Sequence, residues 1–172
     1  MNFDKSIFDK FDKQWALLSA GTKENHNSMT ISWGGVGTLW GKPVVTVYVR
    51  PCRHTYKFME ENDYFAVSFY PEEYRAALAI MGSESGRDID KDAKTGLTVK
   101  DLSGVIADAD AGATDAAGAG AITYEEAEMT FLCKKIYCQD LDTSQVPQDV
   151  LDEYYSVDPM HRLYVGELVE IL

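Results

Sequence analysis

The sequence predicts a mainly β fold: a closed or half-closed antiparallel barrel with helices at its periphery. Two observations support this prediction. At least five segments alternate apolar and polar residues, and glycine or proline turn signals separate them. Strands do not alternate regularly with long helical segments, as they would in a doubly wound parallel sheet.

The first elements are expected to be a helix, a strand and a glycine-rich turn. Residues 4–20 place apolar side chains at helical spacing, which predicts an amphipathic helix. A strand is expected over 28–33, where apolar residues alternate with Thr30 and Ser32. The run 34–37 is rich in glycine, which adopts backbone angles closed to other residues, so a tight turn or bulge is expected. It lacks the GxGxxG and Walker spacings, so its glycines are interpreted as residues of a β-hairpin turn and not of a nucleotide-binding loop.

The centre of the chain alternates strands and helices. The strongest strand is expected over 44–50, because its valines recur at every second position. Proline ends this strand, and Thr55 stands where the N-cap of a short helix over 55–62 belongs. A further strand is expected over 64–70, followed by a helix over 71–81 that a second proline opens.

The remaining third of the chain contains two loops before strand patterning resumes. Residues 82–96 form a Gly/Ser loop leading into a short charged helix. Residues 104–121 are almost entirely Ala, Gly and Asp, so a surface excursion is expected. The last expected elements are a strand over 122–138, a helix over 147–155 and a strand over 162–172 with a bulge at Gly166.

Composition limits the function classes. The 172 residues fit one domain, 1–172, and the net charge of −12 argues against duplex nucleic acid and anionic membranes as partners. The sequence shows no leader and no apolar run long enough to span a bilayer, so a cytoplasmic protein is expected. The odd cysteine count without CxxC spacing argues against a disulfide framework. Cys133 and Cys138 fit small buried side chains, while Cys52 stands among basic residues that could lower the pKa of a thiol.

One window stands out against this acidic background. Residues 25–59 contain no Asp or Glu, where an even distribution would place about six, and retain Arg50, Arg53 and Lys57. Such a locally cationic surface is a candidate anion site. Arg53, His54 and Thr55 cluster where a helix is expected to begin, and free backbone N–H groups there favour an anion.

Five motifs then point to a family. They are NSMTISWGG (27–35), VRPCRHT (49–55), SGRDIDK (85–91), EEAEMTFLCKKIY (125–137) and HRLYVGEL (161–168). Together, in this order and across nearly the whole chain, they resemble the flavin reductase family of FMN-binding split barrels, above all its flavoredoxin-like and NAD(P)H:FMN reductase-like members. The resemblance implies a six-stranded antiparallel Greek-key split barrel, a homodimer, and FMN near the subunit interface.

The resemblance also implies a set of cofactor-binding positions. Those implied to line the flavin from the first strand are Asn27, Thr30, Ser32 and Trp33. Those implied to hold or neutralise the phosphate are Arg50, Arg53, His54 and Thr55. Those implied to reach the flavin from elsewhere are Ser85, Arg87, Lys91 and Tyr164. From the residues alone, Trp33 equally fits a core aromatic, Arg87 and Lys91 fit a solvated charged face, and His161 fits an interface or nicotinamide-side residue.

The implied function is oxidoreduction without a metal and without a catalytic residue of the protein. NADH or NADPH would pass a hydride to FMN, which would pass electrons to an acceptor, so the cofactor carries the chemistry and the protein positions it. Two alternatives stay open. One is an FMN electron carrier without nicotinamide turnover, whose acidic surface docks to a basic redox protein partner. The other is a flavin-free split barrel that acts as a binding module.

Overall fold

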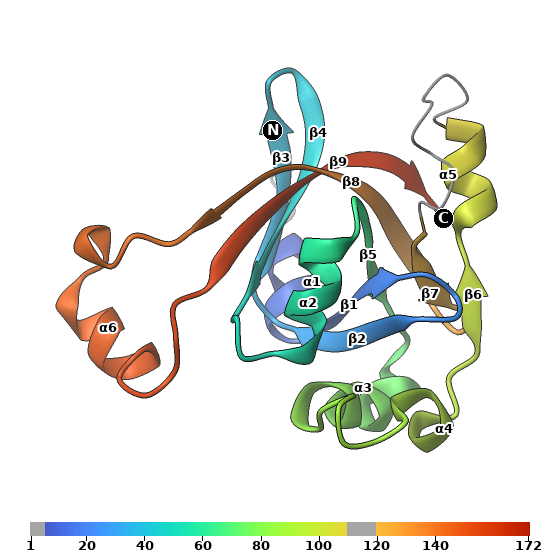
Figure 1. Cartoon of the computed structure of the whole chain (residues 1–172), viewed down its shortest axis with the longest axis horizontal. Helices are drawn as coiled ribbons and strands as arrows, with labels where there is room; N and C mark the ends of the chain where they lie inside the picture. Colours follow the sequence, from blue (N-terminus) through green and yellow to red (C-terminus); the bar gives the residue numbers. More distant parts are fainter. Residues whose placement is uncertain (1–5, 110–119) are drawn as a thin grey trace.

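The computed structural model describes residues 6–109 and 120–172. Within these residues, seven strands form one antiparallel sheet in the order β2-β1-β5-β8-β9-β4-β3 (Figure 1). Its strands are β1 (Ala16–Gly21), β2 (His26–Ile31), β3 (Gly34–Leu39), β4 (Lys42–Val49), β5 (Tyr64–Phe69), β8 (Met129–Asp140) and β9 (Arg162–Ile171). A separate two-stranded sheet pairs β6 (Val99–Asp101) with β7 (Ile122–Tyr124).

Helices lie around this sheet and not within it (Figure 1). They are α1 (Ser6–Asp12), α2 (His54–Glu61), α3 (Arg75–Ser83), α4 (Lys91–Thr95), α5 (Ser103–Ala109) and α6 (Gln148–Tyr154), with 3₁₀ turns at Glu72–Tyr74 and Thr143–Gln145. The expected mainly β fold with peripheral helices is confirmed. None of the helices in the described ranges is long and apolar enough to cross a bilayer.

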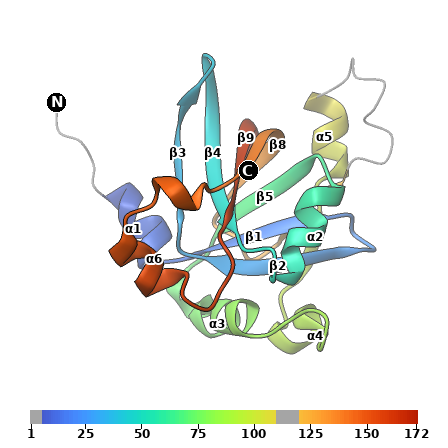
Figure 2. The ribbon, with the colours of Figure 1, turned by 60° about the vertical axis from the view of Figure 1, so that its left-hand side comes forward.

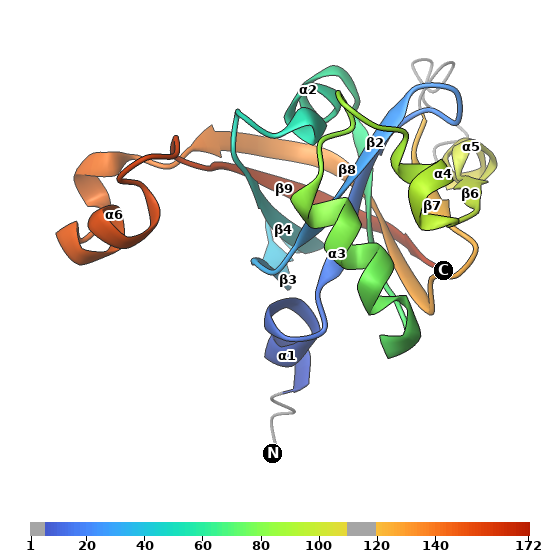
Figure 3. The same cartoon turned by 90° about the horizontal axis from the view of Figure 1, so that it is seen from below.

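The sheet curls into a barrel that stays open at one seam. β2 and β3 stand at opposite ends of the strand order, yet only Ser32 and Trp33 separate them along the chain. The curl encloses a hydrophobic core, whose fully buried members include Leu18, Val47 and Phe65. β2 therefore keeps one edge without a partner strand among the described residues, and α3 lies along that part of the barrel (Figure 3).

The expected helix over 4–20 is wrong beyond Asp12. The chain turns at Trp15, whose φ of 67° is left-handed, and continues as β1. All six residues of β1 are buried, because β2 and β5 flank the strand and side chains cover both of its faces. A strand buried on both faces has a continuous apolar run, and periodicity alone does not separate such a run from a helix. This additional strand is one reason why the sheet has seven strands where six were expected.

The glycine-rich run over 34–37 is a strand and not the expected turn. β3 pairs with β4 from Gly34–Val47 to Leu39–Lys42. The turn lies at Trp40 and Gly41, whose φ angles of 52° and 75° are those of the two-residue hairpins that match strand twist. Gly34 is needed for packing, since a Cβ there would lie 2.7 Å from the Phe11 ring.

The long β8–β9 pair extends away from the barrel and carries α6 at its end (Figures 1 and 2). The expected irregularity at Gly166 is present, but the extra residue is Ile136 of β8, between the Lys135–Gly166 and Tyr137–Val165 pairs. Gly166 itself sits against the core, where a Cβ would meet the Phe65 ring at 2.5 Å.

The Ala/Gly-rich run holds more structure than its composition indicated. Its first part forms most of α5, with Ile106 buried, and Ala121 at its end is fully buried. Residues 110–119 lie outside the described residues. The three cysteines, all in the described part of the chain, are free thiols: Cys133 is buried, Cys138 is partly buried and Cys52 is exposed.

Candidate functional site

A polar pocket of about 230 Å³ lies where β2, the start of α2 and the loop after α3 meet; we call it the anion pocket. Its lining residues are Asn27, Met29, Cys52, Arg53, His54, Thr55, Ser83, Glu84, Ser85, Arg87 and Lys91. Seven of the twelve sequence-predicted cofactor residues are among them. Segments up to 64 residues apart in sequence thus converge on one cationic pocket.

Lys91 is the buried charge of this pocket. Its side chain is 7% exposed, and its Nζ donates to the carbonyl oxygens of Ser28 at 2.9 Å and Met81 at 2.7 Å. Burial, with the nearby charge of Arg53, lowers the pKa of Lys91 to about 8. An ammonium has three donors, so these contacts leave one N–H for a group in the pocket. Interpreting Lys91 as part of a solvated face is wrong.

His54 contributes an unsatisfied buried atom. Its Nδ1 is buried and has no hydrogen-bond partner among the described residues. Burial and the charges of Arg87 and Lys57 lower the pKa of His54, so the ring is neutral near pH 7. With its proton on Nδ1, the ring can donate to an acceptor in the anion pocket. A buried polar atom without a partner is unfavourable, so an acceptor that reached His54 Nδ1 would be favourable here.

Thr55 and Asn27 are hydrogen-bonded to each other in the wall of the anion pocket. Asn27 Nδ2 donates to Thr55 Oγ1 at 2.6 Å, and both residues are buried. The expected N-cap role of Thr55 is wrong, because α2 begins at His54 with Arg53 as its N-cap. The Thr55 hydroxyl faces the interior and keeps its own proton for donation.

The two arginines of the pocket also tie its loops together. Arg53 donates to the carbonyl oxygen of Gly82, and Arg87 donates to that of Cys52 at 3.1 Å. Each guanidinium has five N–H donors and retains several. Ser85 accepts from the Arg87 backbone N–H at 3.2 Å. Glu84 is the acidic residue of the lining, and its carboxylate pairs with Lys94.

Gly86 is a site residue that the sequence reasoning missed. A Cβ at this position would lie 2.1 Å from Asn27 Oδ1 and 3.2 Å from His54 Cδ2. Only glycine lets this loop approach β2 and α2 so closely. The one sequence signal was the Gly/Ser character of the loop, which indicates a turn and not a close approach.

The open edge of β2 leads away from the anion pocket. Thr22 and Asn25 exchange both backbone hydrogen bonds, so the β1–β2 register makes Asn27, Met29 and Ile31 the residues bonded to β1. The backbone groups of Ser28 and Thr30 therefore point to the unpaired edge, and Lys91 already uses the Ser28 carbonyl. Among the described residues, the backbone N–H and C=O of Thr30 have no partner at that edge, while its hydroxyl donates to the Leu78 carbonyl.

A groove of about 200 Å³ follows this edge and opens into a larger apolar pocket. The groove is lined by Met29, Thr30, Ile31, Ser32, Trp33, Tyr48, Arg50 and His161. It shares Met29 with the anion pocket. The larger pocket, about 910 Å³, we call the ring pocket; it is lined by Ile7, Phe8, Phe11, Asp12, Ser32, Trp33, Gly34, Gly35, Val36, Tyr48, Leu141, Tyr155 and His161. Thr30, Ser32 and Trp33 thus lie on one path, which runs along the groove to the ring pocket.

Trp33 lies on the surface of this path. Its side chain is 40% exposed and stands edge-on to Tyr154, with ring centroids 5.3 Å apart. The His161 ring lies 5.2 Å away on the same path. Interpreting Trp33 as a core aromatic is therefore wrong.

The structure does not bring Arg50 into the anion pocket. Its guanidinium pairs with Asp158 at 2.6 Å, donates to the Tyr154 carbonyl at 2.9 Å and stacks over the Tyr155 ring. Arg50 therefore fixes the segment after α6 against the barrel and lines the groove. Sequence adjacency to Arg53 was misleading, because Arg50 ends a strand and Arg53 opens a helix.

Arg50 also determines the tautomer and the protonation state of His161. Its Nε donates to His161 Nε2 at 3.3 Å, which leaves the ring proton on Nδ1, facing Tyr155 Oη at 2.8 Å. Burial and the charge of Arg50 lower the pKa of His161 to about 4. His161 is thus a neutral ring in the wall shared by the groove and the ring pocket.

Tyr164 lines neither the anion pocket nor the ring pocket. It is fully buried in the barrel core, and its hydroxyl donates to Glu60 at 2.6 Å. Alternation along β9 turns this residue inward, where it pairs with Val47 of β4. The sequence motif around Tyr164 did not indicate which face of the strand it occupies.

Comparisons with known proteins identify the family and the fold. A family model described as "Flavin reductase like domain" matches residues 8–171. No curated protein matches the chain. Among solved structures, a flavoredoxin from Methanosarcina acetivorans is 18% identical, with a TM-score of 0.65 over 100% of this chain and 74% of that one.

Two further structures share the fold. An FMN-binding protein from Thermus thermophilus, bound to 1-cyclohex-2-enone, is 17% identical and has a TM-score of 0.64 over 100% of this chain and 76% of that one. Component B of nitrilotriacetate monooxygenase from Bacillus cereus is 17% identical and has a TM-score of 0.63 over 91% and 67%. The fold and the family match together show that this chain belongs to the flavin reductase-like family.

Proposed function

We propose that this protein binds FMN and is a cytoplasmic oxidoreductase that passes electrons from NADH or NADPH through the flavin to an acceptor. The anion pocket would hold the phosphate, and the flavin would follow the open edge of β2 toward the ring pocket. The observation that carries the proposal is the pair of unused donors in one pocket, the buried His54 Nδ1 and the remaining N–H of Lys91.

The donor set fits a phosphate monoester. Such a group carries up to about two negative charges and accepts hydrogen bonds on three oxygens. The anion pocket offers an ammonium, two guanidinium groups, an imidazole and hydroxyl groups. Charge-assisted hydrogen bonds of this kind are the stronger class, and arginine geometry suits phosphate oxygens.

FMN, when bound, supplies the redox chemistry itself, and the protein binds, orients and shields it. Lys91 and His54 would anchor the phosphate, and the Thr30 backbone offers one donor and one acceptor to the flavin edge. The ring pocket is lined mainly by aromatic and aliphatic side chains, which exclude water. Its described lining includes no lysine or arginine, so the reduced nicotinamide ring suits it better than an anionic group.

Anaerobic mixing with NADH and with NADPH tests the proposed function. Purified protein loaded with FMN is expected to lose its yellow absorbance within a catalytic turnover time with one of the two donors. Slow or absent bleaching with both would favour an electron carrier, whose acidic surface would dock to a basic redox protein. Colourless protein that takes up no FMN would leave only the flavin-free binding module.

A homodimer is part of the proposal, and the exposed apolar side chains of the barrel support it. Trp40 at the β3–β4 turn is 66% exposed and stacks edge-on with Tyr137 of β8, which is 39% exposed, at 6.3 Å. Val36 on β3 is 44% exposed. Large exposed aromatic side chains of this kind are typical of interfaces.

Trp40→Glu is expected to shift the protein from dimer to monomer, because it places a charge where an apolar contact is proposed. Size-exclusion chromatography with light scattering gives the mass directly. Lys100→Glu on β6, away from the β3–β4 hairpin, is the control and is expected to stay dimeric (Figure 1). A wild-type protein that is monomeric at all concentrations would contradict the proposal.

A further inference from the structure

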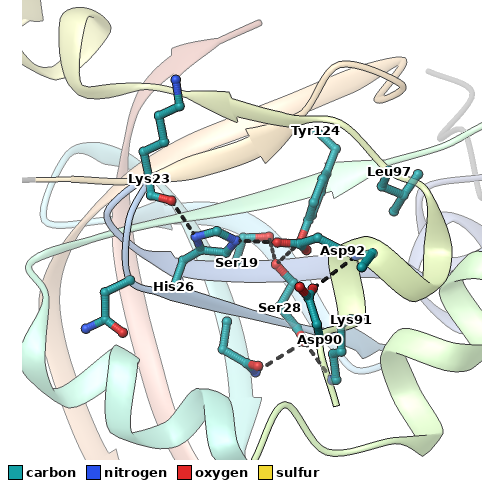
Figure 4. A network of polar contacts seen from close by, with 12 residues as sticks. Ser19, Lys23, His26, Ser28, Asp90, Lys91, Asp92, Leu97 and Tyr124 are labelled. Atoms are coloured by element: carbon teal, nitrogen blue, oxygen red, sulfur yellow. Dashed lines mark hydrogen bonds and ion pairs between the residues drawn. The ribbon is translucent and has the colours of Figure 1, made fainter.

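A chain of buried and partly buried polar contacts lies behind the anion pocket and joins α4 to three strands (Figure 4). His26 Nε2 contacts Asp92 Oδ2 at 2.8 Å, and the Tyr124 hydroxyl contacts Asp92 Oδ1 at 2.7 Å. The same hydroxyl lies 3.0 Å from Ser28 Oγ, which in turn lies 2.7 Å from Ser19 Oγ. Nothing in the proposed function uses these groups directly.

The partners fix where the protons lie. His26 Nδ1 faces the carbonyl oxygens of Thr22 at 3.0 Å and Lys23 at 3.1 Å, which only accept, and Nε2 faces a carboxylate. Both ring nitrogens must donate, so His26 is an imidazolium paired with Asp92, and its pKa is raised mainly by that bond. Tyr124 gives its single proton to the carboxylate, so Ser28 donates to the Tyr124 oxygen.

These contacts determine the position of α4. A helix of five residues has little stability of its own, even with Asp90 as its N-cap. Asp92 attaches it to β2 through His26 and to β7 through Tyr124, contacts that span 66 and 32 residues of sequence. Lys91, one residue earlier, lines the anion pocket, and its Nζ points in another direction, to the carbonyl oxygens of Ser28 and Met81.

The charges of the network also suit an anion nearby. A bare carboxylate next to Lys91 would repel a phosphate in the anion pocket. Protonated His26 and the Tyr124 hydroxyl both bind Asp92, and the pKa of Asp92 is lowered in spite of its burial. The network therefore anchors α4 through the Asp92 carboxylate, and protonated His26 balances the negative charge of that carboxylate.

We propose that His26, Asp92 and Tyr124 are positioning residues for phosphate binding: they hold α4 so that the Lys91 ammonium stays at the anion pocket. This inference rests on the proposed binding of FMN. It assigns a positioning role to three residues that do not themselves line the anion pocket.

The test compares FMN with riboflavin, the same flavin without its phosphate, by equilibrium titration of the full chain. Tyr124→Phe removes only the hydroxyl and leaves the charge of the protein unchanged. We expect FMN affinity to fall about 5- to 10-fold, tenfold being about 1.4 kcal/mol, while riboflavin affinity stays the same. Tyr70→Phe is the matched control, since Tyr70 is a buried tyrosine in the same apolar cluster and does not contact Asp92.

Asp92→Asn separates positioning from electrostatics. Removing a negative charge near the pocket would by itself strengthen phosphate binding, whereas loss of the anchor weakens it. We expect weaker FMN binding with riboflavin unchanged, and tighter FMN binding would overturn the inference.

The remaining outcomes are equally decisive. Equal weakening of both flavins would make the network purely structural, and unchanged FMN affinity in Tyr124→Phe would remove its role. Wild-type protein that binds FMN no better than riboflavin would refute the anion pocket as the phosphate site. Wild-type protein that binds neither would refute the proposed function and this inference with it.

Discussion

Gly86→Ala is expected to weaken FMN binding by about 10- to 100-fold while the barrel stays folded. The new Cβ would lie 2.1 Å from Asn27 Oδ1, far inside van der Waals contact. Asn27 has little freedom to move, because it is buried and its Nδ2 donates to Thr55 and to the Ser28 carbonyl. The loop with Ser85 and Arg87 must therefore retreat from the anion pocket, and the loss of one charged hydrogen bond, at about 1.5–3 kcal/mol, gives this magnitude.

Flavin fluorescence titration measures this loss, and circular dichroism with thermal unfolding reports whether the fold survives. Gly37→Ala is the matched control, since a Cβ at Gly37 meets nothing within 4 Å. FMN affinity that stays at the wild-type level in Gly86→Ala would show that the loop does not form the phosphate site.

Lys91→Met is expected to raise the FMN dissociation constant about 10- to 100-fold near pH 7 through the loss of a charged hydrogen bond. Riboflavin affinity should not change, since the lost donor faces the phosphate. Lys100→Met, on β6 away from the anion pocket and paired with Glu125, is the control and should bind FMN normally. Equal FMN affinity in Lys91→Met and wild type would remove Lys91 from the site.

The FMN affinity of the wild-type protein should also depend on pH in a way that the affinity of Lys91→Met does not. The phosphate binds the protonated amine, so FMN affinity is present below the Lys91 pKa of about 8 and weakens as the pH rises through it. The free energy of unfolding of the FMN-free protein should instead increase as the pH rises. The unfolded lysine keeps its ordinary, higher pKa, so the unfolded state binds more protons above pH 8, and the Lys91 contribution to stability rises with pH there. Titrations between pH 7 and pH 10 test both signs.

The sequence predicted local structure well wherever one face of a strand was polar. The strand over 44–50 corresponds to β4, whose alternation shows directly which side is buried. The strand over 64–70 corresponds to β5, whose six residues are all buried but are mostly aromatic or β-branched, as strands prefer. β1 was mistaken for helix because both of its faces are buried, and β3 was mistaken for a turn because its glycines resemble turn signals, although Gly34 is required by its packing against Phe11. Those two errors share one cause: the deciding partner lies elsewhere in the sequence.

The same reasoning explains which site residues were found. The strand-to-helix junction at Arg53 and His54 is a local feature, and the acid-free window shows it without any long-range information. Gly86 and the His26–Asp92 pair depend on contacts across 59 and 66 residues, which no local pattern contains. Arg50 and Arg53 look equivalent in sequence, and only the structure separates the one that fixes α6 from the one that lines the anion pocket.

A crystal structure of the protein with FMN tests the central claim most directly. The account expects phosphate oxygens within hydrogen-bond distance, about 2.7–3.2 Å, of both Lys91 Nζ and His54 Nδ1, with the flavin along the Thr30 edge of β2. A phosphate bound outside the anion pocket, for example at Arg50, with His54 Nδ1 still lacking a partner, would contradict it.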